Sequence, residues 1–208
     1  QGMKGGMVRG RIVNKFDIDV IAAYSVAIRI DSFASLPAMN LAMALSSFVG
    51  QNMGAGKTDR VKKGYEATLK MNLIITIVLT SVILIFPGWI MKAFSPDINI
   101  INIGKEYLYV VAAFYIVFTT MFVNMGVMRG AGDTLIPMFI TLFSLWLIRI
   151  PLAWILSKYF GYHGIWWSIP LAWISGMTLT YIYYKSGKWK NKAIVKAKPF
   201  DTMDISES

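Results

Sequence analysis

The sequence contains no cysteine and only one histidine, His163, among its 208 residues. Without cysteine there are neither disulfide bonds nor thiolate metal ligands. A single histidine argues against a histidine-built metal site and against a Ser-His-Asp triad. Charged residues are also scarce, at 15%. With no nucleophile, metal or cofactor constellation in the sequence, an enzyme is the class of protein that it favours least.

Apolar residues are abundant instead. Hydrophobic residues make up 56% of the chain and its mean hydropathy is +0.54, which is typical of a polytopic membrane protein. The net charge of +10 comes from Lys and Arg that concentrate between and after the apolar runs. There they would face anionic lipid and set the topology, so the charge does not predict a nucleic-acid partner.

Several apolar segments are long enough to cross a bilayer core about 30 Å thick. They cover about residues 20–49, 69–91, 107–128, 135–156 and 164–184. We therefore predict an all-α polytopic membrane helix bundle with about five complete transmembrane helices plus a truncated one. Because the chain does not begin with methionine, we expect an upstream portion to be missing.

Flanking segments and prolines complete this prediction. Residues 1–19 are expected to be the remnant of a preceding transmembrane helix and loop, and residues 185–208 a basic, then acidic, tail. The distribution of Lys and Arg predicts a multi-pass protein of the cell membrane with that tail in the cytoplasm. Pro37 should kink the first span, while Pro151 and Pro170 should interrupt the fourth and fifth spans.

Two glycine-rich turns follow the first and third spans. Glycine allows close approach of chains and positive φ, so we interpret these turns as gating and packing elements, not as ligand sites. Asp133, at the end of the second turn, is a predicted N-cap for the fourth span. The residues assigned to these motifs are Gly50, Gln51, Asn52, Gly54, Gly56, Arg129, Gly130 and Asp133.

The two turns together, Gly-Gln-Asn-x-Gly-Ala-Gly and Arg-Gly-Ala-Gly-Asp-Thr, resemble the carboxy-terminal half of the multidrug and toxic compound extrusion (MATE) transporters, over about residues 14–188. The resemblance implies a two-lobe transporter in which residues 20–184 are the carboxy-terminal transmembrane lobe and an amino-terminal lobe is the partner. It implies export of amphipathic or cationic drugs and toxic compounds in exchange for H⁺ or Na⁺, with no other cofactor. The Na⁺-coupled branch of that family has a carboxylate before the Arg-Gly turn. This chain has Phe118 at about that position, which directs attention to an acid in the other lobe.

Three charged residues lie within the predicted spans and away from their ends. Asp31 is the only in-span carboxylate and the fallback candidate for coupling, because an intramembrane charge needs protein, water or a partner. Arg29, two residues earlier, points to another face and does not simply pair with it. Arg149 is a hypothetical counter-ion for Asp31. The alternative is that all three lie near the outer interface, with the arginines snorkelling to the headgroups.

A soft apolar face on the third span suits hydrophobic cations, through dispersion and cation–π contacts. Such a face is also common in helix cores and at lipid contacts. Thr120 and Asn124 form a polar stripe beside this face. The amide of Asn124 either contacts substrate or forms hydrogen bonds between helices. Asn40 adds an amide from the first span. The candidate cavity residues are Asn40, Phe118, Thr120, Met121, Asn124 and Met125.

Two other functions remain open at this point. One is a lipid-linked oligosaccharide flippase of the same superfamily. A cavity lined with many more arginines than Arg29 and Arg149 would favour it. A membrane scaffold that does not transport is a third possibility, and gradient-dependent dye efflux would separate it from the antiporter.

Overall fold

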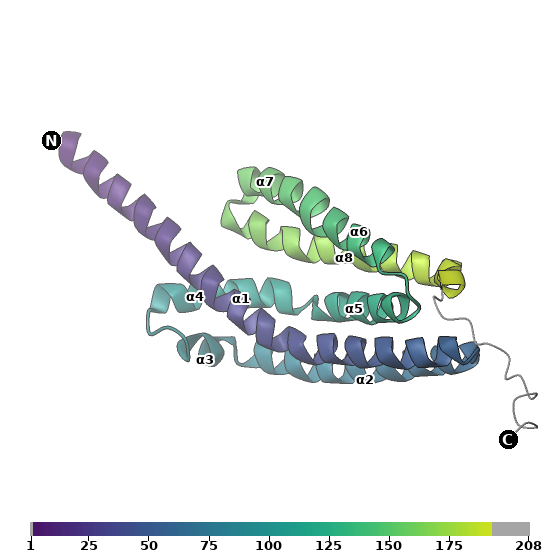
Figure 1. Ribbon diagram of the computed structural model, residues 1–208. Coiled ribbons are helices and arrows are strands. Elements are labelled where there is room, and N and C mark those ends of the chain that lie inside the picture. The colour runs from purple at the N-terminus through teal and green to yellow at the C-terminus, as the bar shows by residue number, and fades with distance from the viewer. Residues whose placement is uncertain (1, 193–208) are drawn as a thin grey trace, which may run out of the picture.

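The computed structural model describes residues 2–192, and every regular element among them is helical (Figure 1). Residue 1 and residues 193–208, which include most of the predicted tail, lie outside the described residues. The elements are α1 (Gly2–Gly54), α2 (Thr58–Ile85), α3 (Pro87–Lys92), α4 (Ile98–Ala112), α5 (Tyr115–Gly130), α6 (Leu135–Leu142), a π-helix η1 (Phe143–Ile148), α7 (Arg149–Phe160), α8 (Tyr162–Ser186) and a 3₁₀ helix η2 (Lys188–Lys192).

Three stretches of helix are long and apolar enough to cross a membrane: Ile18–Gly54, Thr58–Ile85 and Leu135–Phe160. Helices α4 and α5 make a fourth candidate when they are taken together, with a bend of 50° between them. Helix α8, at 25 residues, is long enough but not apolar enough to join them. The predicted helical membrane bundle is therefore confirmed, with three or four clear spans in place of about five.

Helix α1 differs from its prediction at its start. It runs without a break from Gly2, whereas a loop was expected before residue 20. Neither Gly nor Pro occurs between residues 11 and 36, so nothing in this stretch stops a helix. Pro37 lies inside α1. In Figure 1 the purple part of α1 runs at an angle to its blue part, which lies along α2, in agreement with the predicted kink.

The third span is broken where the sequence predicts a continuous helix. Helix α4 ends at Ala112 and α5 begins at Tyr115, and no Gly or Pro marks the break. The second span also ends early, because Pro87 starts the short helix α3 after Phe86. The sequence therefore predicted these two spans but not their ends.

The predicted interruption near Pro151 takes the form of the π-helix η1. The ring of Pro151 would clash with the carbonyl of Leu147 in a regular α-helix, and a wider turn upstream relieves that clash. Pro170 does not have this effect, because α8 is continuous through it. Pro137 lies in the first turn of α6, where it costs little.

Helix α5 lies at the centre of the bundle. It packs against α1 and α2 on one side and α8 on the other, as the layers of Figure 1 show. The packing between α1 and α5 is unusually close: a Cβ at Gly126 would lie 2.6 Å from the carbonyl oxygen of Ala42, and one at Gly130 would clash with that of Ser46. Small residues spaced by four allow two membrane helices to approach in this way.

Buried apolar residues form two clusters along the bundle. The first joins α1, α4 and α8, and includes Ala27, Leu108 and Trp166. The second joins the C-terminal part of α1 to α2 and the end of α5, and includes Val49 and Val127. Polar residues that are buried among these apolar side chains need partners within the protein.

Candidate functional site

A cavity of about 140 Å³ lies between α1, α5 and α8. Among the described residues, Asp31 contributes the only charged side chain on its wall. The other lining residues are aromatic, small or hydroxylic: Ile28, Ser32, Ala34, Ser35, Tyr115, Phe118, Thr119 and Trp173. The rings of Phe118 and Trp173 pack together with centroids 4.7 Å apart. The pocket is therefore lined by aromatic rings and hydroxyl groups, and it holds one carboxylate.

Two tyrosines hold the carboxylate of Asp31. The Tyr107 hydroxyl on α4 donates to Oδ2 at 2.5 Å, and the Tyr115 hydroxyl on α5 donates to Oδ1. Tyr107 is 1% exposed and Tyr115 is 5% exposed. The break between α4 and α5 falls just before Tyr115, so the two helices present their hydroxyls to one acid. Charge-assisted hydrogen bonds of this kind offset part of the cost of placing a carboxylate in a membrane helix.

Sequence reasoning missed both tyrosines. Their spacing of eight residues is close to two helical turns, which places them on a similar side of a helix. That spacing was the available signal, but only the fold brings this side against Asp31.

Arg149 does not pair with Asp31. Its Nη2 donates to the Tyr24 hydroxyl on α1 at 3.0 Å. The Tyr24 ring packs edge-on against Tyr107, with centroids 5.7 Å apart. Arg149 therefore reaches the first span through Tyr24 and not through Asp31, and Tyr107 lies between Tyr24 and Asp31. Arg29 is exposed and does not line the cavity.

Of the predicted cavity residues other than the charges, only Phe118 lines this pocket. Met121 and Met125 are buried in the bundle, and the sulfur of Met125 accepts from Thr141 at 3.8 Å. Thr120 is half-buried and bonds the Ile116 carbonyl of its own helix. Asn40 is exposed on α1. Their role in binding a substrate stays a prediction.

Asn124 takes part in an interhelical network. Its Oδ1 accepts from the Tyr65 hydroxyl on α2 at 2.8 Å, and its Nδ2 donates to Thr180 on α8 at 3.3 Å. The side chain is completely buried. This arrangement matches the alternative considered for a buried membrane amide, a hydrogen bond between helices.

The glycine-rich turns divide into tightly packed and open positions. Gly50 and Gly130 lie at the close crossing of α1 and α5, whereas nothing lies within 4 Å of a Cβ at Gly54. Gly56 has φ +70°, a conformation that favours glycine. Gln51 is exposed, and the amide of Asn52 bonds back to the Phe48 carbonyl at 2.8 Å.

The second turn connects two helices through Asp133. Its Oδ1 accepts from the backbone N–H of Ile136 at 3.4 Å, and its Oδ2 accepts from the Tyr183 hydroxyl at 2.5 Å. The N-cap position of α6 is Thr134, one residue after the predicted Asp133. Arg129 is exposed, with Nη2 3.8 Å from the sulfur of Met125. Asp133 therefore fixes the start of α6 against α8.

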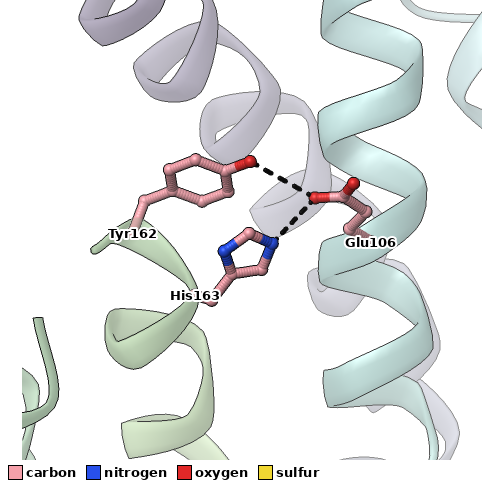
Figure 2. Close-up of polar contacts among 3 residues, drawn as sticks. All are labelled: Glu106, Tyr162 and His163. Carbon is pink, nitrogen blue, oxygen red and sulfur yellow. Dashed lines mark hydrogen bonds and ion pairs between the residues drawn. The ribbon is translucent and has the colours of Figure 1, made fainter. Parts of the chain in front are cut away.

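A second polar cluster joins α4 to the start of α8 (Figure 2). Glu106 Oε2 lies 3.0 Å from Nε2 of His163 and accepts from the Tyr162 hydroxyl at 3.4 Å. Both side chains of the Glu106–His163 contact are about half exposed, so we expect this contact to contribute less than about 1 kcal/mol. Burial and the Glu106 carboxylate raise the pKa of Tyr162, so this hydroxyl keeps its proton well above neutral pH. The cluster ties two helices together at the surface.

Among the described residues, an all-helical bundle with several helices long and apolar enough to cross a bilayer defines a polytopic membrane protein. The family model of MatE matches residues 5–155, so the chain belongs to the MatE family. Within the described residues, no group of three or more metal-ligating side chains comes together. The family assignment confirms the resemblance drawn from the two glycine-rich turns.

Curated relatives and a solved structure agree with this assignment. The chain is 31% identical over 186 residues to the probable multidrug resistance protein YoeA of Bacillus subtilis, covering 88% of this chain and 40% of YoeA. It is 28% identical over 179 residues to the probable multidrug resistance protein NorM of Thermotoga maritima, covering 85% of this chain and 39% of that protein.

The MATE transporter ClbM in complex with Rb⁺ has the same fold, with a TM-score of 0.77 at 19% identity over 90% of this chain and 46% of ClbM. The chain therefore spans about 40% of the length of the curated relatives that it matches. That extent agrees with the single lobe expected from the sequence.

Proposed function

We propose that the chain forms one lobe of a secondary active antiporter that exports amphipathic or cationic compounds in exchange for H⁺ or Na⁺. The observation that carries the proposal is Asp31, an acid inside a membrane-spanning helix that faces an aromatic cavity. The names of the relatives, multidrug resistance proteins, support the substrate class. The complex of ClbM with Rb⁺ supports coupling to a monovalent cation.

The cavity suits exchange at one carboxylate. A proton or Na⁺ and an organic cation would compete for the negative charge of Asp31, so the binding of one releases the other. Phe118 and Trp173 offer aromatic faces to an organic cation. The hydrogen bonds from Tyr107 and Tyr115 hold the carboxylate in place while one cation leaves and the other binds.

The surface of the lobe supports a proposal for its setting in the membrane. Polar residues of α1 form an exposed stripe, in which Ser25, Arg29, Ser32, Asn40 and Ser47 take part. Such a stripe suits a water-filled cleft against an amino-terminal lobe better than lipid. We place the lobe in the cytoplasmic membrane with its carboxy-terminus inside, because basic residues gather at the start of α2 and in η2.

The alternatives are less well supported. The relatives reported above carry names of multidrug resistance proteins, which does not favour a lipid-linked oligosaccharide flippase. Of the two arginines weighed for that function, Arg29 does not line the Asp31 cavity and Arg149 bonds Tyr24. A scaffold that does not transport would have no role for Asp31, an acid that is costly to place inside a membrane helix.

Dye efflux tests the proposal. The full-length transporter that contains this lobe, reconstituted in liposomes loaded with ethidium, should export the dye when a proton gradient or a Na⁺ gradient is imposed. Export that collapses with an ionophore for one of these ions would identify the coupling ion. Dye flux equal to that of protein-free liposomes under both gradients would overturn the proposal.

A charge swap tests the separation of Asp31 from Arg149. Because Arg149 contacts Tyr24, the double change Asp31→Arg with Arg149→Asp should not restore the export lost in the single changes. Tyr24→Phe removes the acceptor and should lower the free energy of unfolding by about 1–3 kcal/mol. Efflux assays and thermal denaturation measure the two effects, and recovery of export by the swap would contradict the geometry.

A further inference from the structure

Asn72 lies on the buried face of α2 and is completely enclosed. Among the residues that the structure describes, neither its Oδ1 nor its Nδ2 has a hydrogen-bond partner. An unpaired amide in an apolar interior costs several kilocalories per mole, and a bilayer supplies no water from outside to reduce that cost. Such a residue in the middle of a membrane lobe calls for a partner.

Polar neighbours connect Asn72 to the Asp31 cavity. Thr76 follows Asn72 by one helical turn, and its hydroxyl lies 3.3 Å from the hydroxyl of Thr119 on α5. Thr119 is itself part of the cavity wall. The two threonines are 4% and 2% exposed, so they are buried along with Asn72.

The polar row continues in the other direction. Tyr65, two turns before Asn72 on α2, donates to Asn124, and Asn124 donates to Thr180. The Tyr65 ring stacks on Tyr184, with centroids 4.3 Å apart. Antiparallel α2 and α5 thus carry polar side chains from the cavity toward the end of the lobe where α1 joins α2. Within the described part of the chain, Asn72 is the buried member of this row whose side chain has no protein partner.

A buried water is a partner that would satisfy such an amide. A buried water needs two to four polar partners. The amide of Asn72 offers a donor and an acceptor, and the Thr76 and Thr119 hydroxyls lie on the same row. Water in such a row moves protons, because each molecule accepts one proton and passes on another without net change.

We propose that Asn72 binds water in a proton pathway that links Asp31 to the end of the lobe where α1 joins α2. This inference rests on the proposed function, with H⁺ as the ion that Asp31 takes up. Asn72, Thr76 and Thr119 order the water and are not themselves proton carriers, so they are positioning residues. The water that gives a proton to Asp31 takes one from the next water in the row, so one proton enters the row from solvent for each proton that Asp31 gains.

Infrared spectroscopy of the full-length transporter in lipid tests this pathway. After a step to lower pH, the carbonyl band of protonated Asp31 should appear, and Asp31→Asn should remove it. In Asn72→Leu and Thr76→Val the band should reach its usual amplitude about tenfold more slowly, a rate change that corresponds to about 1.4 kcal/mol of barrier. Ser81→Ala is the matched control, because Ser81 is exposed on the same helix and bonds only its own Ile77 carbonyl.

The outcomes separate the inference from the proposed function. Asn72→Leu removes an unpaired amide, so its melting temperature should stay the same or rise, and Thr76→Val preserves the shape of the side chain. An unchanged rate in both folded variants would overturn the pathway and leave the role of Asp31 intact. No Asp31-dependent band in the wild type would overturn proton coupling itself. A wild-type response to Na⁺ or Rb⁺ that Asn72→Leu abolishes would show a cation site in place of water and overturn the inference.

Discussion

Replacing Asp31 by asparagine should reduce gradient-driven export by the full-length transporter to background, a loss of about a hundredfold or more. Asparagine keeps the size of the side chain but has no charge for a proton or a cation to neutralise. Its oxygen still accepts from one tyrosine, so the lobe should fold. Initial rates of ethidium efflux from liposomes under an imposed gradient measure the effect. Asp59→Asn is the control, because Asp59 is exposed in the first turn of α2.

The tyrosines around Asp31 give an intermediate test of the same site. Tyr107→Phe and Tyr115→Phe keep the rings and remove one hydrogen bond each. Loss of one charge-assisted hydrogen bond should slow export about tenfold, less than loss of the acid.

One outcome would contradict the role of Asp31. Export that survives in Asp31→Asn at the wild-type rate would assign coupling to an acid in the other lobe.

Replacing Gly130 by leucine should destabilise the lobe by about 3 kcal/mol or prevent its folding. A Cβ at Gly130 meets the Ser46 carbonyl oxygen and the Cβ of Val49, and backbone atoms of α1 cannot move aside without separating the helices. Loss of the close crossing between α1 and α5 would also expose the second buried cluster. Thermal denaturation in detergent measures the change in stability.

The chain offers a matched control for this prediction. Gly54 belongs to the first glycine-rich turn, yet a Cβ there meets nothing within 4 Å. Gly54→Leu should therefore change the melting temperature much less than Gly130→Leu does. Equal destabilisation by the two changes would show that flexibility of the turns matters, and not the approach of α1 to α5.

The sequence predicted the class of the molecule because that depends on local composition. Apolar runs between basic segments predict membrane helices, and the two glycine-rich turns predict the family. Pro151 marked an irregular stretch of helix, since a ring and a missing N–H act within one turn. Asp31 stood out for the same reason, as the only acid inside a predicted span.

Contacts between helices could not be read in this way. The partner of Arg149 is Tyr24, 125 residues away, and the partners of Asp31 come from α4 and α5. Which of many buried tyrosines meets a given charge depends on how the helices rotate and cross. The methionine face of α5 shows the same limit, because its spacing alone does not distinguish a cavity wall from the packed interior in which Met121 and Met125 lie.

The amino-acid sequence by itself determined the helices, the membrane as their solvent and the one acid within it, because periodicity, hydropathy and charge act on neighbouring residues. The tertiary structure alone decided that two tyrosines hold Asp31, that Gly130 lies against Ser46 and that Asn72 is buried without a partner among the described residues. These features depend on side chains from different helices meeting at a few ångströms, and only the packing of the bundle sets such distances.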